Sequence, residues 1–382
     1  MTTPMQTVLL WYDDFHTPLG ALRAILGDAT LLLSVDLGAG TPVPPSPGFG
    51  VQEVDAVSEF AEEYLLRAVR ANALYQGGYH LSAALSRPLL AQVCCRTAAA
   101  AGARRLVHGL TGNDQLRLEM ALHALAPDLE VASVVSLLDG QHSRNRGKYT
   151  ISDNLWGRSV EAGPLADPGA PAPADVLGRC AAPLSVTPAP QAHTVSFAAG
   201  APVAVDGTRY RMADLIGHLN QLAAPFGIGM TDLVEDGFVG LKTRAVYEAP
   251  AAAVLTTAHA DLQRFVCSRR QADAAALVGK AWVDLVYDGF WFDPARASLE
   301  AFLDDVNQWV NGEVDLVFAN GSARPIARRS PHALYAAADA VYQVGHDPAA
   351  GSMSPAARAL SAPMRAAMNR TRQNRPLESE EV

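Results

Sequence analysis

Short apolar runs alternate with segments of helical spacing through the first third of the chain. An apolar run at residues 7–12 precedes a segment with helical spacing at 17–26, and a second apolar run follows at 30–38. A strand–helix–strand unit of this length predicts two parallel strands with a crossover. The same pattern continues with a predicted helix at 81–101, a strand at 105–109, a helix at 115–126 and a strand at 129–138. Residues 1–162 are therefore predicted to form an α/β domain with a doubly wound parallel sheet, which binds ligands at the carboxyl ends of its strands.

The pattern changes after a stretch dense in Pro, Ala and Gly at residues 163–178, which is typical of a linker or a surface crossing. Residues 193–210 then predict a hairpin with Asp206-Gly207 at a turn. Helical spacing follows at 212–224, 258–277 and 298–310, and strand patterns at 313–319 and 324–328. This mixture predicts a second, α+β domain over residues 163–350.

Residues 351–382 are predicted to form a C-terminal helical arm. Leu360, Met364 and Met368 are four residues apart and would share one helical face, with arginines around it. We interpret this face as a contact with the core or with a neighbouring subunit. A helix lying on a membrane surface is the alternative, which the weak apolar face and Pro363 disfavour.

Composition narrows the class of protein. Of 382 residues, 49% are hydrophobic and 18% charged, which excludes wholesale disorder. The formal net charge of −9 offers no general basic surface, so nucleic acid is not expected as a partner. No apolar run is long enough to span a membrane, and no basic stretch precedes the first apolar run as in a secretion signal. The four cysteines have neither disulfide-framework density nor metal-ligand spacing. We therefore expect a cytoplasmic protein without a metal centre.

Six long segments together resemble the argininosuccinate synthase family. They are residues 65–91, 107–131, 149–163, 233–255, 285–294 and 327–335, in the order that the family has them. The resemblance implies a nucleotide-binding domain like that of the adenine nucleotide α-hydrolases, followed by a synthetase domain. It also implies a homo-oligomer, either a homotetramer or a homodimer, and small-molecule amino acids as ligands.

The resemblance implies ligation of citrulline to aspartate with ATP and Mg²⁺. A urea carbon is a poor electrophile and its oxygen a poor leaving group. The family therefore adenylates the ureido oxygen, and the aspartate amine then displaces AMP.

The resemblance places an acceptor pocket for a citrulline-like amino acid. The positions that match the family's citrulline contacts are Tyr79, Arg117, Thr150, Ser159, Glu235 and Tyr247. This set is suited to a free amino acid. Arg117 supplies a planar fork that can bind a carboxylate, and Glu235 supplies an acceptor for an ammonium group. The resemblance also places Thr111, Asn113 and Asp114 at the aspartate contacts. The family usually reads T-G-K-G-N-D in that loop, whereas this chain lacks the Lys and one Gly.

The largest departure from the family lies in the pyrophosphate loop. The family opens with Y-S-G-G-L-D-T-S, and this chain has Tyr12, Asp13, Asp14, His16 and Thr17 in a loop that has lost both glycines. Glycines allow backbone N–H groups to close on phosphates. Two carboxylates near a phosphate would each cost about 3 kcal/mol, whereas micromolar binding is worth about 8 kcal/mol. The sequence therefore predicts that ordinary ATP binding is lost.

The two aspartates have other interpretations. They would cap the following helix, or they would hold Mg²⁺ and recruit phosphates in a different way. His16 is a candidate general base without an identified partner.

Three hypotheses for function follow. The first is a C–N ligase that joins a ureido amino acid to an amine donor. The second is an ATP-independent lyase or transferase of specialised metabolism that uses the same pocket. The third is a non-catalytic paralogue that binds an amino acid or a partner synthase.

Overall fold

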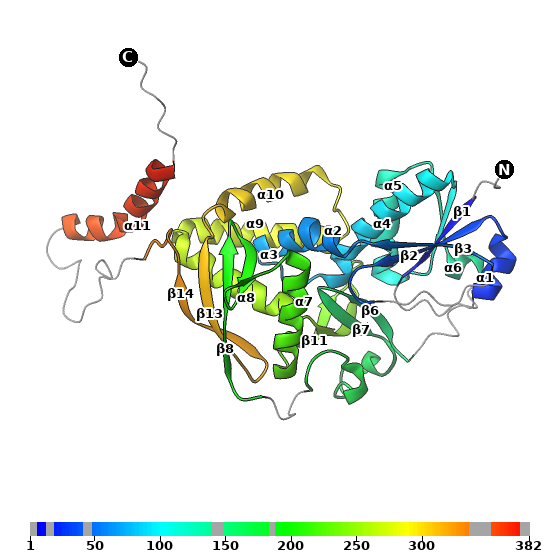
Figure 1. Cartoon of the computed structure of the whole chain (residues 1–382), viewed down its shortest axis with the longest axis horizontal. Helices are drawn as coiled ribbons and strands as arrows, with labels where there is room; N and C mark the ends of the chain where they lie inside the picture. Colours follow the sequence, from blue (N-terminus) through cyan, green and yellow to red (C-terminus); the bar gives the residue numbers. More distant parts are fainter. Residues whose placement is uncertain are drawn as a thin grey trace, which may run out of the picture.

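The computed structural model describes residues 6–12, 19–40, 48–138, 148–182, 188–335 and 353–374. Three sheets follow one another along the long axis of the molecule, and the C-terminal helix lies at the end opposite the N-terminus (Figure 1). Among the described residues, no helix is long and apolar enough to span a membrane.

The first sheet is parallel throughout and has the strand order β3-β2-β1-β4-β5. Its strands are β1 (Thr7–Trp11), β2 (Thr30–Asp36), β3 (Gly50–Asp55), β4 (Arg105–His108) and β5 (Glu130–Ser133). Val8, Leu9 and Leu10 of the central strand are at most 1% exposed, as expected for a parallel sheet covered on both faces. The predicted doubly wound sheet is confirmed.

Helices cover both faces of this sheet. Leu9 and Val107 face one side and pack with Leu22 of α1 (Leu19–Leu26) and Val134 of α6 (Val134–Leu137). The other side packs on α4 (Ser82–Ala101), and α5 (Gly112–Leu125) lies beside α4. The apolar runs of the sequence are thus divided between two separate cores.

One sequence prediction in this region is corrected, and two elements were not predicted. The strand expected at 129–138 ends at Ser133, because the Ser133 hydroxyl accepts a hydrogen bond from the Ser136 amide and starts α6. The edge strand β3 was not predicted, since it is mostly exposed and has no apolar run. The sequence pattern also did not predict one helical stretch, which consists of α2 (Val57–Glu59), the π-helix η1 (Phe60–Leu65) and α3 (Leu66–Arg70).

The second sheet is antiparallel, with the order β10-β9-β8-β13-β14. It consists of β8 (Gln191–Ala198), β9 (Ala201–Val205), β10 (Thr208–Arg209), β13 (Gly312–Ala319) and β14 (Ser322–Arg329). The main hairpin turns at Ala199-Gly200, and Asp206-Gly207 forms the second turn, between β9 and β10. Both turns place their residues at positive φ, which Gly adopts readily. The segment predicted as one hairpin therefore forms two successive hairpins, β8–β9 and β9–β10, the second of which ends in a short strand.

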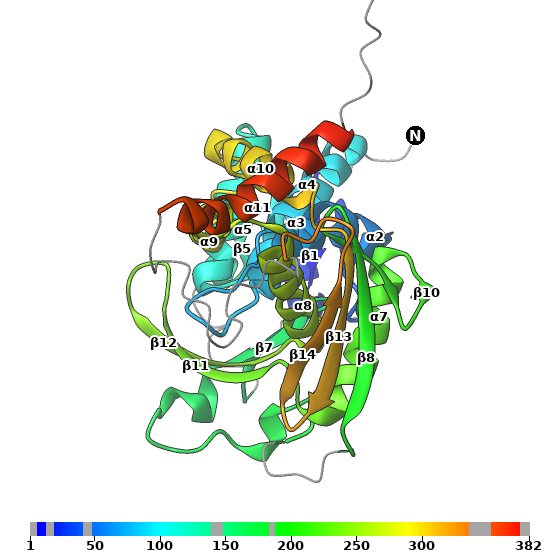
Figure 2. The ribbon, with the colours of Figure 1, turned by 90° about the vertical axis from the view of Figure 1, so that its left-hand side faces the viewer.

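Four helices complete this part of the chain, with α7 (Met212–Ala223) and α8 (Pro250–Val266) packed against the second sheet (Figure 2). The others are α9 (Arg269–Tyr287) and α10 (Pro294–Asn307). The single helix predicted at 258–277 is two helices. The chain leaves α8 at Cys267, and the Ser268 side chain caps α9 by accepting a hydrogen bond from the Gln271 amide.

The third sheet joins strands from both sides of the Pro-rich stretch. Its order is β11-β12-β7-β6, with β6 (Thr150–Asn154), β7 (Gly157–Glu161), β11 (Met230–Asp236) and β12 (Lys242–Glu248). The stretch itself is packed rather than free, because Leu165 and Val176 are fully buried against this sheet. The domain boundary at residue 162 remains a prediction, and it falls beside a strand that pairs with later ones.

The predicted arm is a continuous helix, α11 (Met353–Asn374), which Pro363 does not interrupt. Arg370 anchors it by donating to the Val266 carbonyl at 2.8 Å and by lying 3.9 Å from the centre of the Trp309 ring. Met364 and Met368 are exposed. The side chain of Leu360 lies outside the described part.

Candidate functional site

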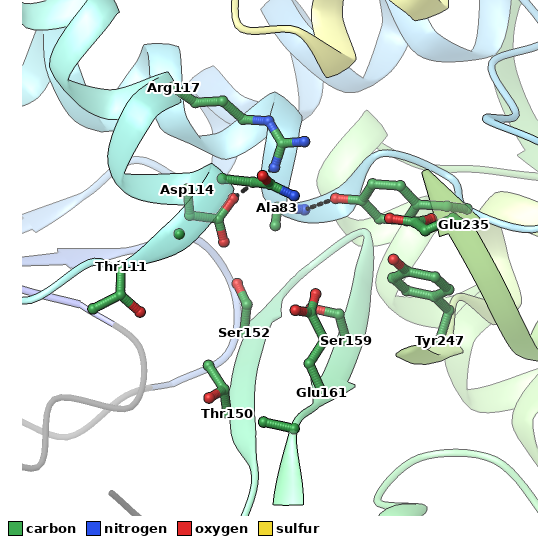
Figure 3. Close-up of a pocket in the computed structure, with 14 residues that line it drawn as sticks. Ala83, Thr111, Asp114, Arg117, Thr150, Ser152, Ser159, Glu161, Glu235 and Tyr247 are labelled. Carbon is green, nitrogen blue, oxygen red and sulfur yellow. Dashed lines mark hydrogen bonds and ion pairs between the residues drawn. The ribbon is translucent and has the colours of Figure 1, made fainter. Parts of the chain in front are cut away.

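The nine residues predicted from the sequence to bind amino acids line one cavity of about 230 Å³ (Figure 3). The cavity lies between the start of α5, the start of α4 and one face of the third sheet. Its lining is Tyr79, Ala83, Thr111, Gly112, Asn113, Asp114, Arg117, Thr150, Ser152, Ser159, Glu161, Ala162, Glu235 and Tyr247. The α5 residues directly follow the carboxyl end of β4, which is where the strand order predicts a ligand.

The alternation of side chains along β6 and β7 builds the polar floor of the cavity. Thr150 lies opposite Glu161, and Ser152 lies opposite Ser159. Ser159 in turn pairs with Tyr247 of β12. Because residues opposite each other in antiparallel strands share a face, these five side chains point the same way.

Two buried arginines hold the carboxylate of Asp114. Arg87 donates from Nη2 to Oδ2, and Arg117 donates from Nη1 to Oδ1, both at 2.8 Å. Burial acts to raise the pKa of Asp114, but the charges of Arg87 and Arg117 outweigh it and lower that pKa. Asp114 is therefore a carboxylate whose position is fixed from both sides.

Arg117 is oriented before any ligand arrives. It is 5% exposed, its Nε donates to the Tyr287 carbonyl at 2.7 Å, and its guanidinium lies 4.6 Å from the centre of the Tyr287 ring. Its Nη2 has no hydrogen-bond partner within the described ranges. One edge of the planar fork thus remains for an anionic group.

Glu235 presents a buried carboxylate oxygen to the cavity. The side chain is 4% exposed, and Oε1 accepts a hydrogen bond from the Tyr287 hydroxyl at 3.0 Å. Oε2 is buried and has no hydrogen-bond partner among the residues that the structure describes. Burial raises the pKa of Glu235, although the hydroxyls of Tyr287 and Tyr247 lower it in part. Because an unpaired buried acceptor is costly, this oxygen is suited to a ligand's ammonium group.

The predicted tyrosines line the cavity as stacked rings. Tyr79 and Tyr247 stack with centroids 4.4 Å apart. The Tyr79 hydroxyl accepts hydrogen bonds from the amides of Ala83 and Ala84 at 3.0 and 3.1 Å. It therefore satisfies two of the free N–H groups at the start of α4. Burial raises the pKa of Tyr79, so its hydroxyl stays protonated.

Sequence reasoning missed three polar residues of the site. Arg87 is fully buried within the apolar helix α4, and a charged residue in such a run was itself a signal. Ser152 and Glu161 follow from the alternation that Thr150 and Ser159 begin. Glu161 keeps access to solvent while protein atoms crowd around it. That crowding, with repulsion from Asp114 and Glu235, raises the pKa of Glu161 to about 7.

Only part of the predicted nucleotide side is described. Tyr12 is buried, and the guanidinium of Arg87 lies 5.1 Å from the centre of its ring. The other predicted residues of this loop, Asp13, Asp14, His16 and Thr17, lie outside the described residues. At the end of β2, the Asp36 carboxylate accepts a hydrogen bond from the Gly38 amide at 2.7 Å, which forms a tight turn. No group of metal-ligating side chains is present in the described ranges.

Comparison with known proteins gives two family matches. Residues 49–150 match the arginosuccinate synthase N-terminal HUP domain, and residues 149–354 match the arginosuccinate synthase C-terminal domain. Residues 1–48, which contain the altered loop, precede both matched ranges.

Curated relatives agree with these matches. An argininosuccinate synthase from Pyrococcus furiosus is 37% identical over 304 residues, which is 76% of this chain and 74% of that protein. One from Lactiplantibacillus plantarum is 40% identical over 301 residues, or 74% of this chain and 73% of that protein. One from Rubrobacter xylanophilus is 36% identical over 334 residues, which is 81% of this chain and 82% of that protein.

Proposed function

Because the chain belongs to the argininosuccinate synthase family, we propose that it is a C–N ligase that joins a citrulline-like ureido amino acid to an amine donor such as aspartate. The observation that carries this proposal is the cavity itself. All nine positions expected to contact the two amino acids line it, although they come from distant parts of the sequence. Nine positions without a common function would not be expected to converge on one cavity.

The two ends of an amino acid have matching groups in this cavity. A carboxylate would bind the free edge of Arg117, where a planar guanidinium gives charge-assisted hydrogen bonds. An ammonium group would bind Oε2 of Glu235. The hydroxyls of Thr150 and Ser159 would fix the ureido group on the sheet face. The amine donor would lie at the start of α5, near Thr111 and Asn113.

Activation of the ureido oxygen would come from ATP with Mg²⁺, as in the family. Asp13 and Asp14 stand where the family has glycines, so we further propose that ATP binds weakly or in an altered mode. The same substitutions favour a second candidate, a non-catalytic paralogue that binds an amino acid or a partner synthase. An ATP-independent lyase or transferase on this pocket is the remaining alternative. In each case we propose a cytoplasmic homo-oligomer.

The test is AMP release from ATP and Mg²⁺ in the presence of citrulline and aspartate. If the chain is a ligase, it should release one AMP for each molecule of ligated product. Calorimetry with citrulline tests the pocket, with Arg117→Ala as the disrupting variant and Arg96→Ala, on an exposed helical face, as the matched control. Citrulline binding without AMP release would favour the paralogue. The absence of binding to any amino acid would contradict both enzyme hypotheses and leave only a paralogue that binds a partner synthase.

A further inference from the structure

Glu161 is an acidic residue of the cavity for which amino-acid binding leaves no role. It is the last residue of β7, opposite Thr150 of β6 and Ala245 of β12. Figure 3 shows its side chain on the same sheet face as Ser159, directed into the cavity. The residue remains accessible to solvent, so a proton held there can be exchanged with water.

Charged groups face Glu161 from three other elements. Asp114 and Arg117 belong to α5, Arg87 to α4 and Glu235 to β11. The titratable hydroxyls are Tyr79 and Tyr247, and their protonated forms are favoured by burial. Glu161 is thus placed between the acceptor side, with Glu235 and Tyr247, and the donor side, with Asp114.

The ligation requires a proton acceptor at this place. A donor amine is an ammonium ion at neutral pH, and it has no lone pair for attack until it loses a proton. We propose that Glu161 is the general base that takes this proton from the donor amine, an inference that rests on the ligase function proposed above.

In the proposed step, a proton passes from the donor amine to Glu161, and AMP is the leaving group. The donor N–H bond breaks, the proton forms an O–H bond on Glu161, and the electron pair stays on nitrogen. That pair forms the C–N bond to the carbon of the adenylated ureido group. The C–O bond to the adenylate oxygen breaks, and AMP leaves with that electron pair. The second amine proton moves to the isourea nitrogen, so the product is a guanidinium ion. Glu161 returns its proton to water.

The other acids and bases of the cavity are less suited to this step. Asp114 is held by two arginines that lower its pKa, so it is a weak base. Glu235 is deeply buried, and the acceptor's ammonium group occupies its open oxygen in the proposed complex. The pKa of Glu161, at about 7, lies near the operating pH, where a general base is most effective.

The experiment separates the two half-reactions in Glu161→Gln. Pyrophosphate exchange into ATP with citrulline reports adenylation, and it should stay within about two-fold of the wild type. Product formation with aspartate should fall about 10²- to 10⁴-fold, the usual contribution of a general base. Hydroxylamine, an amine that is largely neutral at pH 7, should be used as donor by both proteins at similar rates. An equal loss with both donors would mean that Glu161 only shapes the pocket, and would overturn the proposal.

The pH profile and matched variants complete the test. The rate with aspartate should rise with pH through about 7 in the wild type, as Glu161 loses its proton, and this limb should vanish in Glu161→Gln. Glu161→Asp should keep the limb at a lower rate, and Glu63→Gln on the surface should change nothing. A wild type that ligates no amine would refute the ligase and the base together. A ligating wild type with a fully active Glu161→Gln would refute the base alone.

Discussion

Asp114 accepts a hydrogen bond at 2.8 Å from Nη1 of Arg117, which lies one turn later on α5. The sequence assigns these two residues to different ligands, one to the donor and one to the acceptor. The structure makes them a pair, and the second oxygen of Asp114 binds Arg87 of α4. A change on the donor side is therefore expected to disturb the acceptor side as well.

Asp114→Asn is predicted to reduce the free energy of unfolding by about 3 kcal/mol, because it leaves two buried arginines without a full counter-charge. The lowered pKa of Asp114 means that this contribution is present above about pH 4, the unfolded value, and is lost as the pH falls through the folded pKa. Urea unfolding at pH 7 and pH 3 measures it. The difference in the free energy of unfolding between variant and wild type should be smaller at pH 3 than at pH 7. Asp128→Asn, on an exposed turn, is the control, and a gap independent of pH would contradict the prediction.

Glu235→Gln is predicted to weaken citrulline binding about 10- to 100-fold, which corresponds to a lost charge-assisted hydrogen bond of about 1.5–3 kcal/mol. The raised pKa of Glu235 shows that the folded protein disfavours its charge. The protonated Glu235 side chain therefore contributes its full stability below about pH 4, the pKa of Glu in the unfolded chain. That contribution is lost as the pH rises through the pKa of Glu235 in the folded protein.

The same variant should therefore be more stable than the wild type at pH 7 in the absence of ligand, and no more stable at pH 4. Calorimetric titration and thermal unfolding at the two pH values measure both effects. Unchanged citrulline affinity would show that the ammonium group binds elsewhere.

Tyr79→Phe is predicted to cost about 1 kcal/mol of stability, the usual value of a helix N-cap, since two amides at the start of α4 lose their acceptor. The ring remains stacked on Tyr247, so the cavity should keep its shape. Chemical denaturation gives the magnitude. Tyr210→Phe is the matched control, because the Tyr210 ring stacks on His218 and its hydroxyl has no hydrogen-bond partner in the described part of the chain. Equal stability of both variants would exclude the cap.

Replacement of Asp13 and Asp14 by glycine is predicted to strengthen ATP binding by at least 10-fold. Removing either carboxylate would relieve about 3 kcal/mol of repulsion toward a phosphate at an effective dielectric near 20. Titration with ATP and Mg²⁺ measures the change, and the double Asp→Asn variant separates lost charge from regained backbone freedom. Should the aspartates instead hold Mg²⁺, glycine would weaken ATP binding.

The fold was largely predictable where local pattern and burial coincide. The apolar runs at residues 7–12 and 30–38 became β1 and β2, because a strand buried on both faces must be apolar throughout. Edge strand β3 and the sheet of β6, β7, β11 and β12 were not predicted. Their pattern is weaker, since one side of these strands faces solvent or the polar cavity.

The sequence by itself determined the family, the parallel sheet and the nine positions that line the cavity. Tertiary structure alone decided how those residues act on one another. Arg87, Asp114 and Ser152 are distant in sequence, yet they meet through hydrogen bonds of 2.8 and 3.0 Å. The raised pKa of Glu161 likewise depends first on the protein atoms that crowd around it and then on Asp114 and Glu235, which only the packing of α5 and β11 brings near. Periodicity records which face of an element is buried, whereas charge pairing depends on distances between elements, and these exist only in the folded chain.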